Sequence, residues 1–329
     1  MANRSRRALL RLAATLSALP LTGAGAQGSA RWPTRPIRLI VAFAAGGNTD
    51  LIARLLAERL AAELGQSVVV ENRTGAAGII GAEAVARSAP DGYTLFLGSL
   101  STQAIHVSLY QGRLPYNPVT DFTPISRTTV GTHMLIVHPS LPATSVAELA
   151  ALAKARPGAI SYGSGGNGTS THICGEMFRQ MAGVELLHVP FRSTAPAATA
   201  LLSGDIQMMF DTFSSAQPQV KQGRARALAV TSVQRNPAAP DIPTMAETLP
   251  GFEADTWDGV FAPALLPSPI VERVNAAVQA SLAHPGFVSR LETAGLQPFP
   301  AGPAEFAAFQ RAEVEKWGRA VRAANITAE

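Results

Sequence analysis

The sequence predicts an α/β protein with two hinged lobes and a cleft between them. Apolar runs of strand length alternate with segments of helical period along most of the chain, which is the pattern of sheets covered by helices. The pattern starts twice, and each start has a glycine-rich loop between a strand and a helix. The 329 residues suffice for two domains. With 47% hydrophobic and 15% charged residues, the composition is that of a folded chain.

The first 26 residues have the features of a secretory signal peptide. A basic start ends at Arg7, and an apolar stretch covers residues 8–21. The small-residue sequence Ala24-Gly25-Ala26 then precedes Gln27, so we expect cleavage before Gln27 and a soluble protein exported to the periplasm. The alternative is an uncleaved membrane anchor. An anchor needs about 20 predominantly apolar residues, whereas Arg11 interrupts this stretch.

The net charge of +4 comes from this N-terminal segment. It holds four arginines and no acidic residue, and the rest of the chain holds 23 basic and 23 acidic residues. A neutral mature chain does not favour nucleic-acid binding, so we expect no nucleic-acid partner. Cys174 is the only cysteine and no two of the six histidines stand four residues apart, so we expect neither a disulfide nor a metal site.

The first lobe starts with a strand, a glycine loop and a helix. The strand is Ile37–Phe43, the loop is Ala44–Thr49, and Asp50–Leu64 has the apolar spacing of a helix. Short connections then lead through a strand, a helix and a third strand, as a parallel sheet requires. These three elements are predicted at residues 67–71, 79–87 and 93–97.

The chain crosses to a second lobe between Thr123 and Pro139, where a new alternation begins. This lobe is predicted to have helices at 146–155 and 169–181 and strands at 159–162, 186–189, 206–210 and 225–231. After a proline-rich stretch, the return to the first lobe is predicted to have a strand at 255–261 and helices at 270–282, 287–294 and 304–323. We therefore assign residues 27–128 and 255–329 to lobe 1, and residues 129–254 to lobe 2.

The two glycine loops occupy corresponding places in the two lobes. Open parallel sheets bind ligands at this edge, and a helix start offers unpaired N–H groups and the positive end of the helix dipole. Neither Ala44–Thr49 nor Gly163–Gly168 contains Lys or Arg, so amides and hydroxyls would have to bind an anion. This composition favours a small carboxylate over a polyphosphate. The alternative is that the loops only make tight turns and that Asp50 only caps a helix.

Six short motifs follow one another along the mature chain. They are Pro33–Val41, Gly46–Arg54, Val69–Arg73, Pro90–Leu95, Gly166–Thr169 with His172, and Ala225–Thr231. In order and spacing they resemble the tripartite tricarboxylate transporter substrate-binding proteins of the Bug type, over essentially the whole mature chain. The resemblance implies a two-lobed periplasmic binding protein of type II, with two parallel-core mixed sheets flanked by helices and joined by two crossover strands.

The resemblance also implies what the protein binds and with which partners it works. A small organic carboxylate would lie between the two glycine loops, partly through bridging waters, and a monomeric receptor would deliver it to the membrane subunits of a tripartite transporter. The implied contacts are Gly46–Asp50 in one lobe and Ser164–Thr169 in the other, with Phe43 as a wall of the pocket. The chain departs from the family pattern at Pro190–Ser193, where an aromatic, a lysine and a glycine are usual, and at Asn48, where glycine or serine is usual.

Two further polar residues are candidates because of their position in the second lobe. Asp211 follows the strand at 206–210 and so lies at a carboxyl end, or alternatively caps the segment at 213–220. His172 either reaches the cleft or has a structural role. The complete set of candidate ligand-binding residues is Phe43, Gly46, Gly47, Asn48, Thr49, Asp50, Ser99, Ser164, Gly166, Asn167, Gly168, Thr169, His172 and Asp211.

Two other ligand-related interpretations start from the same fold. Gly163, Gly165 and Gly168 fit the dinucleotide-binding fingerprint, but no acidic residue follows about 20 positions later, so no cofactor is expected. A receptor of the same fold could also serve a sensor kinase, and the sequence does not separate that role from transport.

An exported hydrolase is the third interpretation. Ser164, His172 and Asp211 could form a catalytic trio in the cleft. However, Tyr162 stands where the nucleophile elbow has glycine, and nothing in the spacing of the three residues demands a trio. The sequence therefore favours a transport receptor without enzyme activity.

Overall fold

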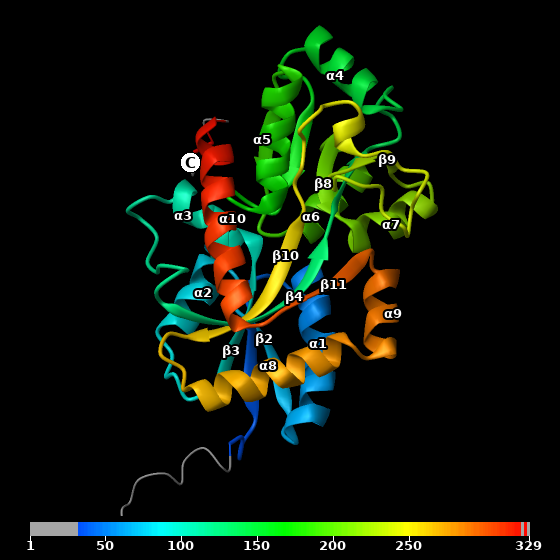
Figure 1. Ribbon diagram of the computed structural model, residues 1–329. Coiled ribbons are helices and arrows are strands. Elements are labelled where there is room, and N and C mark those ends of the chain that lie inside the picture. Colours follow the sequence, from blue (N-terminus) through cyan, green and yellow to red (C-terminus); the bar gives the residue numbers. More distant parts are fainter. Residues whose placement is uncertain (1–31, 324–325, 328–329) are drawn as a thin grey trace, which may run out of the picture. The chain divides into compact units, whose positions relative to one another are not determined.

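The computed structural model describes residues 32–323 and 326–327, and from Pro33 onward the chain forms two mixed sheets flanked by helices (Figure 1). Sheet A has six strands and sheet B has five. The predicted α/β class with two mixed sheets is thereby confirmed. The predicted signal peptide, residues 1–26, lies outside the described residues.

Sheet A combines a parallel half with an antiparallel half. In spatial order its strands are β11 (Leu296–Ala301), β4 (Phe122–Gly131), β10 (Thr256–Pro263), β3 (Thr94–Ser99), β1 (Ile37–Val41) and β2 (Val68–Asn72). β1 pairs in parallel with β2 and β3, whereas β10 pairs antiparallel with β3 and β4. Every residue of β3 is buried, which is typical of a strand covered on both faces.

Helices cover sheet A and position the first glycine loop. They are α1 (Asn48–Leu64), α2 (Ile79–Ala86), α3 (His106–Leu109), α8 (Ser268–Leu282), α9 (Pro285–Thr293) and α10 (Pro303–Ala323), together with the 3₁₀ turn η1 (Ala76–Gly78) and the π-helix η2 (Ser101–Ile105). α1 packs against α8, and α10 lies along η2 and α3. Among residues 32–323 and 326–327, none of the helices combines the length and the apolar character needed to cross a bilayer.

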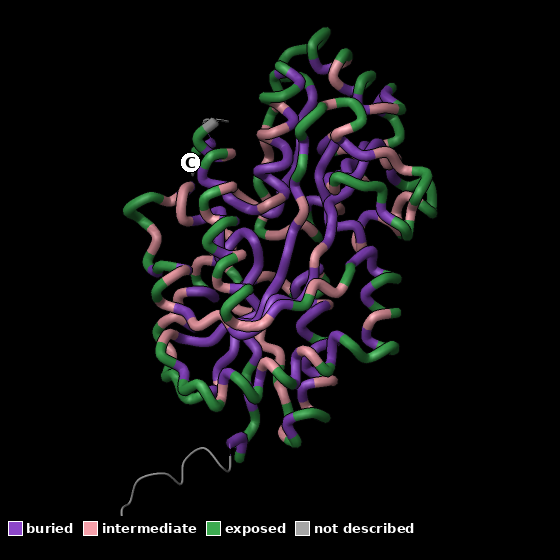
Figure 2. The backbone as a smooth tube through the Cα atoms, viewed as in Figure 1, coloured by how far each residue is buried: buried purple, intermediate pink, exposed green. Residues whose placement is uncertain are grey.

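Sheet B repeats this plan with the second glycine loop. In spatial order its strands are β7 (Leu187–Pro190), β6 (Ser161–Ser164), β8 (Met208–Thr212), β5 (His133–Val137) and β9 (Arg226–Val230). β6 pairs in parallel with β7 and β8, and β5 pairs antiparallel with β8 and β9. The remaining elements are α4 (Val146–Ala155), α5 (Ser170–Ala182), α6 (Thr194–Ser203), α7 (Phe213–Lys221) and the 3₁₀ turn η3 (Met245–Glu247). Buried residues fill the inner strands of both sheets, such as β3 and β10 in sheet A and β5 and β8 in sheet B (Figure 2).

Two chain segments cross between the sheets. β4 leaves sheet A at Gly131 and β5 enters sheet B at His133, and the chain returns to β10 after Ala254. β4 and β10 pair along their length and run side by side in Figure 1. The hydroxyl of Thr231 accepts a hydrogen bond from His133 N (2.9 Å) and donates one to Ala254 O (3.0 Å). One buried residue therefore contacts both crossings, while the exact boundaries of the lobes remain a prediction.

Among the elements that were not predicted from the sequence, β11 and α6 contain proline. β11 has Pro298 and Pro300, which argue against a strand, but it lies at the edge of sheet A, where missing N–H donors are tolerated. α6 has Pro196 in its first turn, where a missing N–H breaks no helical hydrogen bond. In these two elements proline stands at the edge of a sheet and at the start of a helix, where its missing N–H is tolerated.

Candidate functional site

A pocket lies between the two sheets, where four helices begin. It encloses about 690 Å³, part of which is open to solvent. Sheet A contributes the loop after β1, the start of α1, and residues of β3 and β10. Sheet B contributes a residue of β5 and the starts of α5, α6 and α7. The pocket therefore lies at the strand ends where the fold predicts a ligand site.

Three of these helix starts carry no side-chain cap. The N-cap residues Gly47 of α1, Ser193 of α6 and Thr212 of α7 make no capping hydrogen bond, and all three line the pocket. Helix starts leave N–H groups without intrahelical partners and carry the positive end of the dipole. α5 differs, because the Thr169 hydroxyl accepts a hydrogen bond from His172 N. The pocket wall thus offers N–H donors to an anion.

No lysine or arginine from the described part of the chain lines the pocket to hold an anion. Its titratable groups, among the described residues that line it, are His133 and Asp258. Burial lowers the pKa of His133 to about 4, so its imidazole is neutral at pH 7. Its Nε2 lies 2.9 Å from the hydroxyl of Ser170. An anion here would be bound by amides and hydroxyls.

Asp258 is the acidic residue of the pocket. It lies within β10, opposite Ser99 of β3 and Thr129 of β4, and is 2% exposed. The hydroxyl of Thr49 donates a hydrogen bond to Asp258 Oδ1 at 3.0 Å. Burial raises the pKa of Asp258 to about 7. Asp258 was not predicted from the sequence, and the available signal was an acidic residue of a predicted strand, directly before the uncharged run at 259–263.

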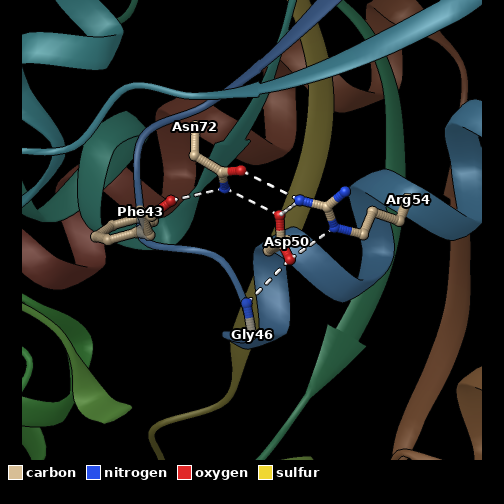
Figure 3. Close-up of polar contacts among 5 residues, drawn as sticks. All are labelled: Phe43, Gly46, Asp50, Arg54 and Asn72. Carbon is tan, nitrogen blue, oxygen red and sulfur yellow. Dashed lines mark hydrogen bonds and ion pairs between the residues drawn. The ribbon is translucent and has the colours of Figure 1, made fainter. Parts of the chain in front are cut away.

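Asp50 holds the first glycine loop in place (Figure 3). Its carboxylate accepts hydrogen bonds from Gly46 N (3.0 Å), from Nε and Nη2 of Arg54 (both 2.9 Å) and from Asn72 Nδ2 (2.9 Å). Asn72 also donates to Phe43 O (2.9 Å). Burial opposes the ionisation of Asp50, but the hydrogen bonds from Arg54, Gly46 and Asn72 outweigh it and lower its pKa. Asp50 therefore fixes the loop and does not line the pocket.

Replacing Asp50 by alanine should lower the free energy of unfolding by about 2 kcal/mol at pH 7, because Gly46 N and Asn72 lose their acceptor. The folded-state pKa is lowered, so this stabilisation is present above the unfolded pKa and is lost as the pH falls through the folded pKa. Urea unfolding at pH 7 and pH 3 measures both effects. Glu63→Ala, which removes the Arg59–Glu63 pair of the same helix, is the control and should cost about 0.5 kcal/mol or less. Equal losses in the two variants would contradict the role given to Asp50.

The second glycine loop makes hydrogen bonds on both sides: Gly165 N donates to Thr171 Oγ1 (3.0 Å) at the pocket, whereas Ser164 and Gly168 bond to histidines outside the pocket lining. Ser164 Oγ lies 2.7 Å from His188 Nε2, and Gly168 N donates to His172 Nδ1 at 3.1 Å. The two imidazoles stack with their ring centroids 4.3 Å apart. The side chain of Ser164 therefore pairs with His188, and not with His172 as the trio of a hydrolase would require.

Asp211 is wholly buried and does not line the pocket. β8 runs to Thr212, past the predicted end at residue 210, and Thr212 lines the pocket instead. Successive side chains of a strand point to opposite faces, so Asp211 faces away when Thr212 faces the pocket. Its Oδ1 accepts a hydrogen bond from Thr212 N (2.8 Å), and burial raises its pKa to about 6.

The structure brings part of the predicted set together. The predicted residues that line the pocket are Phe43, Gly47, Asn48, Thr49, Ser99 and Thr169. Those that lie outside the lining are Gly46, Asp50, Ser164, Gly166, Asn167, Gly168, His172 and Asp211. Asn167 and His172 line a second pocket. Gly166 and Gly168 therefore shape the start of α5, and the helix start itself lines the pocket between the sheets.

Several lining residues were not predicted from the sequence. They include Ser101, His133, Ser193, Thr212, Thr256 and Asp258. Ser101, Ser193 and Thr212 each follow or end a strand that leads into a helix, so the rule that found the glycine loops could have found them. His133 and Thr256 begin the strands that follow the crossings. Nothing in the sequence pattern marks those two positions as pocket residues.

Comparisons with known proteins show which family this chain resembles. The family model described as "Tripartite tricarboxylate transporter family receptor" matches residues 52–326. Protein BugT of Bordetella pertussis is 36% identical over 293 residues, which cover 88% of this chain and 90% of that protein. The structure of R. palustris Rpa4515 with adipate has a TM-score of 0.87 and 36% identity, and covers 90% of this chain and 99% of that one. MatC from Rhodopseudomonas palustris with bound malate has a TM-score of 0.84 and 34% identity, and covers 88% of this chain and 100% of that one.

Proposed function

Because this chain belongs to the tripartite tricarboxylate transporter family of receptors, we propose that it captures a small carboxylate in the periplasm and passes it to the membrane subunits of a tripartite transporter. The observation that carries the proposal is the convergence of three uncapped helix starts on a pocket without a basic lining residue. A carboxylate accepts several N–H and O–H donors at once. A neutral sugar would leave these helix starts without an anion.

Two solved relatives support the ligand class. Rpa4515 is described with adipate and MatC with bound malate, and both ligands are dicarboxylates. The two relatives share about a third of their residues with this chain and have the same fold. For this chain we therefore propose the class of ligand, a small carboxylate, and no individual compound.

In the proposed complex the carboxylate bridges the two lobes. Asn48 and Thr49, at the start of α1, face it from the lobe assigned to residues 27–128 and 255–329. Thr169 and Thr194, at the starts of α5 and α6, face it from the lobe assigned to residues 129–254. A ligand that contacts both lobes only when they close favours the closed state, so capture is coupled to hinge bending.

The cellular setting follows from the family and from the N-terminal sequence. We propose that residues 1–26 direct export and that the mature protein works in the periplasm as a monomer. Its partners would be the carboxylate and the membrane subunits of the transporter. The proposal assigns no catalytic step to the chain, because capture and release need none.

Small mono- or dicarboxylates should raise the melting temperature of the protein, whereas sugars and metal ions should not. At a free ligand concentration a hundred times Kd, binding stabilises the folded state by about 2.7 kcal/mol, which a thermal scan detects. The measurement is a scan of the purified protein against a panel of organic acids, with sugars and divalent cations as controls. A sugar or a metal ion that shifts the melting curve while no acid does would rule out the carboxylate assignment.

Delivery to a transporter needs a separate test. An acid that binds in the thermal scan is supplied in labelled form to cells with and without the gene for this chain. Uptake should fall in cells without the gene and return with the gene restored. Uptake that does not change, for an acid that the purified receptor binds, would contradict the transport role and leave the binding role intact.

A further inference from the structure

We propose that Asp258 selects ligands that carry a cationic nitrogen, so that the preferred ligand is a small amino carboxylate. This inference rests on the proposed function, because the carboxylate end of the ligand is taken to bind at the helix starts. It deepens that function by assigning Asp258, which is hydrogen-bonded to Thr49 at the start of α1, to a second ligand group.

The first argument is the position of the Asp258 carboxylate. It lines the pocket from β10 and is 2% exposed. Among the residues that the structure describes, the hydroxyl of Thr49 is the only side chain that hydrogen-bonds to it. The backbone of Asp258 is fixed separately, because Thr128 Oγ1 donates to Asp258 O at 2.8 Å. A carboxylate has several acceptor positions, so it retains acceptor capacity toward the pocket.

The second argument is that this charge has no cationic partner among the described residues. A buried carboxylate without a paired cation is unfavourable, and its pKa is accordingly raised to about 7. The neighbouring arginine on β4, Arg127, donates to Phe299 O (2.8 Å) and stacks on the rings of Phe299 and Phe309. His133 across the pocket is neutral at pH 7, because burial lowers its pKa to about 4.

Positive and negative groups both lie along the pocket wall. The starts of α1, α6 and α7 give the wall positive character, and Asp258, which accepts a hydrogen bond from Thr49 at the start of α1, adds a negative group beside it. A zwitterion with a carboxylate and an ammonium group complements both. A dicarboxylate would bring a second negative charge toward Asp258, which is unfavourable unless one of the two carboxylates takes up a proton.

Matched ligand pairs test the proposal. Aspartate, malate and succinate share a four-carbon skeleton and differ in an ammonium, a hydroxyl or a hydrogen at one carbon. 4-Aminobutanoate and glutarate differ in one end group, an ammonium or a carboxylate. Titration calorimetry measures Kd for each compound with the full-length mature protein, with Asp258→Asn, and with Asp255→Asn. Asp255 is the control because it is also an aspartate with a raised pKa, but it lies outside this pocket.

We expect the amino compound of at least one set to bind the wild-type protein about tenfold or more tightly than its nitrogen-free partner. Asp258→Asn should reduce this ratio to near one, and Asp255→Asn should leave it unchanged. Nitrogen-free partners that bind the wild-type protein as tightly as the amino compounds would overturn the inference, and so would a ratio that survives in Asp258→Asn. If Asp258→Asn does not fold, the ratio of the two Kd values measured with the wild-type protein decides the test by itself. Should none of the acids in the wider panel bind, the proposed function fails and this inference fails with it.

Discussion

Gly168→Val should abolish carboxylate binding and remove the ligand-induced rise in melting temperature. Gly168 has a φ of 85°, a conformation that β-branched residues rarely adopt. An added Cβ would lie 2.5 Å from Leu109 Cδ2 and 3.2 Å from the Tyr110 ring. Valine is disfavoured at this positive φ and its Cβ requires a shift of Leu109 or of the loop, so we expect the loop to move together with Thr169 and the start of α5 that lines the pocket. Titration calorimetry with an acid from the panel measures the loss.

Gly183→Val is the matched control for this prediction. Gly183 ends the same helix with a φ of 62°, and nothing lies within 4 Å of the position of an added Cβ. Both variants carry left-handed backbone strain of roughly 1–2 kcal/mol, but only Gly168→Val displaces the helix start. Gly183→Val should therefore lose stability and keep its affinity. Normal affinity in Gly168→Val would show that this loop does not shape the site.

Asp258→Asn should stabilise the protein in the absence of ligand, by about 4 kcal/mol at pH 8 and by less at pH 5. The folded-state pKa of about 7 lies above the ordinary aspartate value of 3.8. Between these values the folded chain keeps a proton that the unfolded chain has lost, so the wild-type free energy of unfolding decreases as the pH rises through this range. Asparagine carries no charge, and its side-chain oxygen still accepts the hydrogen bond from Thr49.

Urea unfolding of both proteins at pH 5 and pH 8 gives the difference directly. The lowered pKa values of His106, His133 and His188 change stability in the opposite direction, with loss as the pH falls below about 6.5. These three histidines are present in both proteins, so their contribution cancels in the comparison. A difference that does not grow from pH 5 to pH 8 would refute the burial of an unpaired charge at Asp258.

The fold could be predicted from the sequence because apolar runs of strand length alternate with segments of helical period. Both ends of the helix at Val146–Ala155 were predicted correctly. Ser145 caps the start of this helix. β1 was predicted to continue to Phe43 but ends at Val41, because an apolar run does not reveal where strand pairing stops. The π-helix at Ser101–Ile105 was not predicted, since its period differs from that of an α-helix.

The site was harder to predict because it depends on which face each strand turns to the pocket. Thr169 and Asn48 line the pocket as expected for helix starts after strands. Thr212 lines the pocket in place of the predicted Asp211, because β8 continues past residue 210. Asp258 comes from an antiparallel strand far along the chain, and only the pairing of β10 with β3 brings it beside Ser99. Local patterns carry no information about that pairing.

The hydroxyl of Thr231, which contacts both crossings, has a mechanical consequence. If a single segment joined the two lobes, they could rotate about its axis. Here Thr132 Oγ1 also lies 3.1 Å from Thr231 Oγ1, so hydrogen bonds link the two crossing segments to each other. Two linked segments resist rotation of one lobe about the other, and hinge bending is then the motion of lowest energy. The lobes would then close along the same bending path for ligands of different lengths. The membrane partner would contact the same closed conformation whichever ligand is bound.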